Sequence, residues 1–211
     1  MPKLPRIYID ACPFIDMAKY EAKHSLAHKP GEQALREKDV WYCKKILESA
    51  RAQEVEVYTS MISIAECTTV QPGQPSPPQD SQTFFDALLA SGNSGVKLVQ
   101  LTYLITIRAR SLKWDNQLNL KGMDAIHYAT ALRMECDEFW TTDGRVEILG
   151  NAANLGKMLI VRASNTALLR PKYIQQGTAN LFEEPMSEQE YDVRLEALKA
   201  EALEAERTDA S

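Results

Sequence analysis

The chain has 211 residues, of which 45% are hydrophobic, and a formal net charge of −5 at pH 7. This length supports one substantial hydrophobic core with appendages, whereas two full domains would each be small. No apolar run is long enough to span a membrane and the first ten residues lack the apolar core of a signal peptide, so we expect a cytoplasmic protein without a membrane partner. The four cysteines form no CxxC pair, which argues against a zinc site or a disulfide framework.

The negative charge is concentrated at the C-terminus. Residues 182–211 hold ten acidic and three basic residues, a balance of −7, which leaves +2 on residues 1–181. An acidic protein is an unusual partner for nucleic acid, because phosphate binding favours a basic surface. The mildly basic main body nevertheless permits such binding.

Short β-rich segments alternate with longer helical patterns along most of the chain. The predicted strands are residues 6–9, 55–58, 96–101, 138–141 and 157–161. The predicted helices are residues 32–53, a helix that Thr59 or Ser60 caps and that continues through Val70, and residues 81–90, 102–114 and 123–134. Such alternation is typical of βαβ units, so we predict a three-layer α/β/α fold around a parallel sheet.

The C-terminal stretch has a different character. Ser187 and Glu190 have the spacing of a capping box, and an acidic helix with a narrow apolar stripe should follow. We therefore predict a main domain over residues 1–165, a linker over 166–186 and an amphipathic acidic helix over 187–207. The stripe fits docking on the protein's own body, or a partner-binding or dimerising arm.

Acidic residues lie where the strands of the predicted sheet end and where its helices begin. Asp10 and Asp143 follow strands, Asp124 opens a helix, and Glu66 lies in the helix after the second strand. Sites in open parallel sheets form at the carboxyl ends of the strands. Converging carboxylates repel one another unless they share protons or bind cations, and hard oxygen ligands select Mg²⁺ or Mn²⁺. The cluster would suit phosphodiester hydrolysis, although each aspartate could instead cap a helix and Glu66 could be an exposed helical residue.

Four sequence runs carry a family resemblance. RIYIDACPFI, SIAEC, GMDAIHYATAL and FWTTDGRV resemble, in order and spacing, the PIN-domain nucleases, including the VapC-type toxins of bacterial toxin–antitoxin pairs. The resemblance implies endonucleolytic cleavage of RNA, with Mg²⁺ or Mn²⁺ held by Asp10, Glu66, Asp124 and Asp143. It further implies that the Thr141 hydroxyl, in a TxD pattern, supports the acidic site. The chain departs from the family where Ala11 and Cys12 replace small hydroxyl or amide residues, and where Val146 replaces an aromatic residue.

Further residues are candidates for supporting roles. His127, three residues after Asp124, could bind the metal or could pack and form hydrogen bonds, and Asp16 and Glu147 could extend the acidic site. A basic patch beside Trp114 suits single-stranded RNA, although a solvated helix face would have the same composition. The patch consists of Arg108, Arg110 and Lys113.

These observations favour a metal-dependent endoribonuclease, most simply a VapC-like toxin that a cognate antitoxin inhibits and that forms a homodimer. A catalytically inactive PIN-like binding module, acting through protein or RNA contacts, is the alternative. A metal-dependent phosphatase is a weaker one, because no DxDxT follows the first strand and no glycine loop cradles a phosphate.

Overall fold

The structure is a computed structural model that describes residues 3–27, 29–70, 73, 76–90, 92–116, 118–146 and 157–175. The chain divides into two compact units, Met1–Thr166 and Ala167–Ser211. The first part of the predicted linker holds a short helix, α8 (Pro171–Gln175), in the second unit. The acidic helix predicted over 187–207 lies outside the described residues.

The first unit is built around one sheet. Its described strands are β1 (Arg6–Ile9), β2 (Glu56–Ser60), β3 (Val96–Val99), β4 (Glu138–Trp140) and β5 (Leu159–Val161). They are all parallel, in the order β3-β2-β1-β4-β5. The described helices of this unit are α1 (Ala11–Glu21), α2 (Gln33–Arg51), α3 (Ile62–Glu66), α4 (Gln79–Phe85), α5 (Tyr103–Trp114) and α6 (Gly122–Arg133), with a π-helical turn η1 (Asp86–Ala90) and a 3₁₀ turn η2 (Ala163–Asn165).

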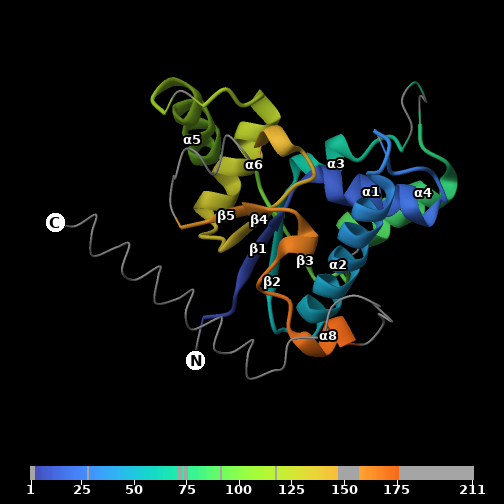
Figure 1. Cartoon of the computed structure of the whole chain (residues 1–211). Helices are drawn as coiled ribbons and strands as arrows, with labels where there is room; N and C mark the ends of the chain where they lie inside the picture. Colours follow the sequence, from blue (N-terminus) through green and yellow to red (C-terminus); the bar gives the residue numbers. More distant parts are fainter. Residues whose placement is uncertain are drawn as a thin grey trace. The chain divides into compact units, whose positions relative to one another are not determined.

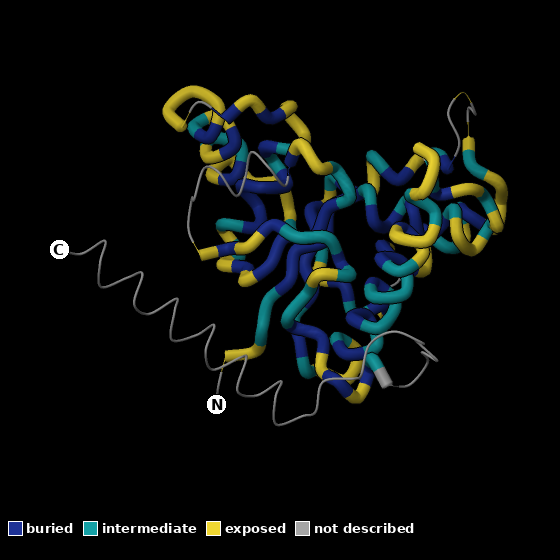
Figure 2. The backbone as a smooth tube through the Cα atoms, in the orientation of Figure 1, coloured by how far each residue is buried: buried dark blue, intermediate teal, exposed yellow. Residues whose placement is uncertain are grey.

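Helices cover both faces of the sheet. In Figure 1, α1, α2 and α4 lie on one side of the strands and α5 and α6 on the other. Tyr8, Phe139 and Ile160 occupy neighbouring positions on adjacent strands and share one core with α5 and α6. Successive residues of a strand face opposite sides, so Ile7 and Ile9 face the other layer. The three central strands β2, β1 and β4 are almost wholly buried, whereas the edge strands β3 and β5 are partly exposed. Figure 2 shows this burial along the backbone, and the predicted three-layer fold is confirmed.

The helix after β2 differs from the prediction. Thr59 and Ser60 do not cap it but lie within β2, which continues to Ser60. The Thr59 hydroxyl donates to the carbonyl oxygen of Ile9 on β1, so a tertiary contact holds it in the strand. The helix itself, α3, ends at Glu66 and does not reach Val70.

The strand order places a site at the centre of the sheet. From β1 the chain moves outward through β2 and β3, and then returns to add β4 and β5 on the other side of β1. Ligands of open α/β sheets bind outside the carboxyl ends of the strands at such a reversal. The reversal lies between β1 and β4, which Asp10 and Thr141 directly follow. No helix within the described ranges is long and apolar enough to cross a membrane.

Candidate metal centre

Asp10 is fixed where β1 passes into α1. Its Oδ1 accepts the backbone N–H of Ala11 at 2.6 Å, which caps α1, and its Oδ2 accepts the Thr141 hydroxyl at 2.9 Å. The residue is only 7% exposed. Asp10 is thus a helix cap, which was the alternative to a catalytic role. It is also a buried carboxylate at the switch point of the sheet, where the strand order reverses between β1 and β4.

Glu66 and His127 meet beside Asp10. Glu66 is the last residue of α3, and its Oε2 lies 2.5 Å from Nε2 of His127 on α6. The same Nε2 lies 3.6 Å from Oδ1 of Asp10. One potential ligand atom from each of the three residues lies within 4.8 Å of the other two. Two carboxylates and an imidazole therefore converge from three separate elements.

Tyr8 contacts this group through His127. Its hydroxyl lies 2.7 Å from Nδ1 of His127 and accepts the backbone N–H of Ser60 at 2.9 Å. Its ring stacks on Phe139 in the core. From the sequence, Tyr8 is expected in a strand and has no predicted role in the site. The one available signal was an aromatic residue with a polar end, two positions before Asp10, a spacing that places two side chains on the same side of a strand.

The other two predicted acids lie nearer the surface. The carboxylate of Asp143 accepts two bonds from the Arg145 guanidinium, at 2.6 and 3.2 Å, and its backbone N–H donates to Thr141 Oγ1. Thr141 therefore bridges Asp10 and Asp143. Asp124 is half-buried in the first turn of α6, one turn before His127, and makes no direct hydrogen bond to the other three acids within the described residues.

The pKa values reflect this division. Burial raises the pKa of Asp10, and the nearby His127 and the Thr141 hydroxyl oppose the shift. Burial lowers the pKa of His127, but the hydrogen bond to Glu66 and the charge of Asp10 outweigh it, so the pKa lies above its ordinary value. The hydrogen bond from Arg145 lowers the pKa of Asp143. The inner carboxylate is thus short of positive charge, whereas Asp143 already has a cation.

The thiols beside the site remain neutral. Burial raises the pKa of Cys67 to about 12 and also raises the pKa of Cys12. Neutral thiols are poor metal ligands, because the thiolate is the form that binds. The donors open to an ion are therefore carboxylate oxygens, which suit Mg²⁺ or Mn²⁺. The two ring nitrogens of His127 are already paired with Tyr8 and Glu66. All four cysteines are free.

The other candidate residues lie away from the acids or outside the described residues. Asp16 does not extend the site, because its buried carboxylate accepts a hydrogen bond from Arg36 at 2.8 Å. Glu147 lies outside the described residues. The predicted RNA-binding residues are exposed on α5, where Arg110 stacks 4.7 Å above the Trp114 ring, and no described hydrogen bond joins them to the acids. These are Arg108, Arg110 and Lys113.

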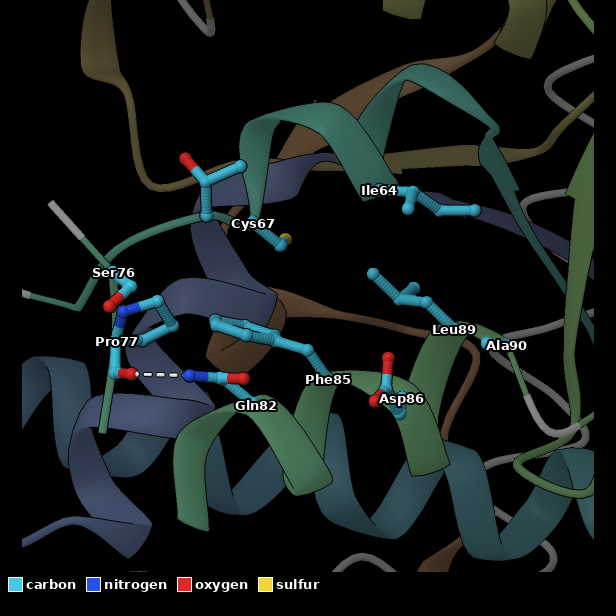
Figure 3. A pocket seen from close by; sticks show the side chains of 10 residues that line it. Ile64, Cys67, Ser76, Pro77, Gln82, Phe85, Asp86, Leu89 and Ala90 are labelled. Carbon is cyan, nitrogen blue, oxygen red and sulfur yellow. Dashed lines mark hydrogen bonds between the residues drawn. The ribbon is translucent and has the colours of Figure 1, made fainter. Parts of the chain in front are cut away.

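An apolar pocket of about 330 Å³ lies between α3 and the α4–η1 segment. Figure 3 shows Ile64 of α3 and Cys67, the residue that follows this helix, facing Phe85 and Leu89. None of the four predicted acids is among its described lining residues. The pocket therefore adjoins the helix that carries Glu66 but is separate from the metal centre.

Comparison with known proteins agrees with this architecture. The PIN domain family matches residues 32–151, which is more than half of the chain. The match includes Glu66, Asp124, Thr141 and Asp143, whereas Asp10 precedes it. No curated protein matches the chain, and no solved structure does.

Proposed function

Because the chain belongs to the PIN domain family, we propose that it is a Mg²⁺- or Mn²⁺-dependent endoribonuclease that hydrolyses RNA phosphodiester bonds. The observation that carries the proposal is the convergence of Asp10, Glu66 and His127 at the switch point of the sheet. A buried carboxylate is costly unless a positive charge meets it. Here the inner acids have one histidine between them, which leaves room in the charge balance for a cation.

The metal would be held by Asp10 and Glu66 at the inner end, with Asp124 and Asp143 completing the acidic set. When bound, a divalent ion supplies Lewis-acid chemistry that polarises the phosphoryl group and activates water. Thr141 orients Asp10 through its hydroxyl and fixes the turn that carries Asp143. Oriented carboxylates of this kind hold an ion in a defined place against the scissile bond.

Basic side chains would hold the RNA backbone. Arg145 is exposed beside Asp143, where a phosphate could compete for its guanidinium. Arg108, Arg110 and Lys113 offer a second cationic surface on α5, and Trp114 offers a ring on which a base can stack. The substrate in this proposal is single-stranded RNA.

We further propose a toxin role of the VapC type, with a cognate antitoxin and self-association into a homodimer. Its support is the resemblance of the four motif runs to those toxins, and such a toxin acts on cellular RNA in the cytoplasm. Induced expression should arrest bacterial growth, and the Asp10→Asn variant should not. Equal growth arrest by the wild type and by Asp10→Asn would contradict this role.

The enzymatic proposal is tested with end-labelled single-stranded RNA, with and without Mn²⁺ or Mg²⁺. We expect metal-dependent cleavage by the wild type, none by Asp10→Asn or Asp124→Asn, and full activity in the matched control Asp80→Asn. Asp80 is exposed at the start of α4 and has the same side chain. A wild type that binds no metal and cuts no RNA would favour the inactive binding module instead.

A further inference from the structure

A chain of hydrogen bonds runs from the backbone of the sheet to the metal centre. The Ser60 N–H of β2 donates to the hydroxyl of Tyr8 on β1, at 2.9 Å. That hydroxyl pairs with Nδ1 of His127 on α6 at 2.7 Å, and Nε2 of the same ring pairs with Glu66 of α3 at 2.5 Å. One continuous path therefore joins four separate elements.

One assignment of the hydrogens gives every bond along this path a donor and an acceptor. The Tyr8 oxygen already accepts from Ser60, so its own proton is free to be donated to Nδ1 of His127. A neutral histidine that accepts at Nδ1 carries its hydrogen at Nε2, where it faces Glu66. Tyr8 is 0% exposed and His127 is 1% exposed, so solvent does not compete for these bonds.

Glu66 is the member of the site that most needs support. It ends a helix of five residues, and its side chain is 27% exposed. A glutamate in that position has several rotatable bonds, and ordering it on metal binding costs conformational entropy. Asp10, by contrast, is already fixed by Ala11 and Thr141.

We propose that Tyr8 and His127 are positioning residues that hold the Glu66 carboxylate toward Asp10, so that the metal centre is formed before the ion arrives. This inference rests on the proposed metal-dependent function. It assigns Tyr8, a core residue by its burial, a role in the site through its hydroxyl alone. Outer partners that orient metal ligands typically change metal affinity by roughly 10- to 100-fold when they are removed.

The test compares Tyr8→Phe with Tyr128→Phe in the full chain, using calorimetric titration with Mn²⁺. Both changes remove one hydroxyl from a tyrosine that lies in the same core and packs near Phe139. We expect Tyr8→Phe to weaken Mn²⁺ binding by roughly 10-fold or more, with Tyr128→Phe at the wild-type value. RNA cleavage by Tyr8→Phe should recover at Mn²⁺ concentrations raised by the same factor.

A second pair of variants tests His127. The amide of His127→Gln can still donate to Glu66, whereas His127→Leu cannot. We expect the glutamine variant to retain more Mn²⁺ affinity than the leucine variant, with thermal melting of both recorded beside it. A merely structural role would make affinity follow melting temperature rather than the presence of a donor.

The outcomes separate the two proposals. Wild type that binds Mn²⁺ and cuts RNA, with Tyr8→Phe indistinguishable from Tyr128→Phe, overturns the positioning role and leaves the nuclease intact. Wild type that neither binds Mn²⁺ nor cuts RNA overturns the nuclease proposal and the positioning role with it.

Discussion

Carboxylates at the two ends of the sheet differ in the positive charge that the protein provides for them. At the amino end, Glu56 accepts bonds from Arg6, Tyr58 and Lys97, and Asp137 accepts the Arg6 backbone N–H. At the carboxyl end, Asp10 and Glu66 share one histidine. Arg6 and Lys97 provide the positive charge for Glu56, whereas Asp10 and Glu66 could accept a cation from solution. The same residue type therefore has a structural role at one end of the strands and a proposed chemical role at the other.

The largest expected contrast is in metal stabilisation. Mn²⁺ at 100 times its dissociation constant should stabilise the wild type by about 2.7 kcal/mol, a rise in melting temperature of roughly 5 to 10 °C. Asp10→Asn should abolish the rise, because the buried ligand is lost. Glu56→Gln, at the other end of the sheet, should keep it. Equal rises in the two variants would show that the ends do not differ as described.

Thr141→Val should affect both stability and activity. The hydroxyl is buried, donates to Asp10 and accepts the Asp143 N–H, so its loss should cost about 1 to 3 kcal/mol of unfolding free energy. Because Asp10 loses its orienting partner, RNA cleavage should also fall by roughly 10-fold.

Thr130→Val is the matched control for this change, since its buried hydroxyl donates to the Ile126 carbonyl within α6. Denaturant unfolding and cleavage rates measured on both variants give the answer. Loss of activity in Thr130→Val to the same degree would remove the special role of Thr141.

Arg145→Ala should change the rim of the site without affecting its interior. Arg145 lowers the pKa of Asp143, so its removal should raise that pKa toward the ordinary value, and Asp143 should then take up its proton at a higher pH. Carboxyl carbon NMR titration measures this directly. Arg133→Ala, another exposed arginine change, should leave the pKa of Asp143 where it is.

The smallest effect should come from Glu56→Gln. The hydrogen bond from Lys97 is the main cause that lowers the pKa of Glu56 from 4.5 to about 2. A lowered carboxyl pKa stabilises the fold above the ordinary value, and that stability is lost as the pH falls through about 2. Because this ion pair is partly exposed, the variant should lose less than about 1 kcal/mol at pH 7. In urea unfolding, the difference in unfolding free energy between the wild type and Glu56→Gln should narrow between pH 4.5 and pH 2. A difference that stays constant over this range would contradict the lowered pKa of Glu56.

The periodic elements were predictable because their signals are local. The strand Arg6–Ile9 agrees with its prediction. The helix predicted over 102–114 is found as Tyr103–Trp114, with Thr102 as its cap rather than its first residue. The end of β2 was not predictable from local signals, because Thr59 is held in the strand by a hydrogen bond to Ile9, fifty residues away.

The candidate site was predictable where family motifs mark it and not where it depends on long-range packing. Asp10 and Glu66 lie close together beside His127. The central place of His127 was weighed only as one of two roles, and that of Tyr8 was missed. Their partnership joins residues 119 positions apart, which no local spacing encodes. Asp16, weighed only as a residue that could extend the site, pairs instead with Arg36 on another helix, which local spacing does not encode either.

The most direct test of the central claim is to locate the ion. Crystals of the full chain soaked in Mn²⁺ and measured at a wavelength where manganese scatters anomalously would place it without reference to activity. We predict an anomalous peak in contact with the carboxylates of Asp10 and Glu66, and none in crystals of Asp10→Asn. A peak elsewhere, or no peak at this end of the sheet, would contradict the assignment of the metal centre.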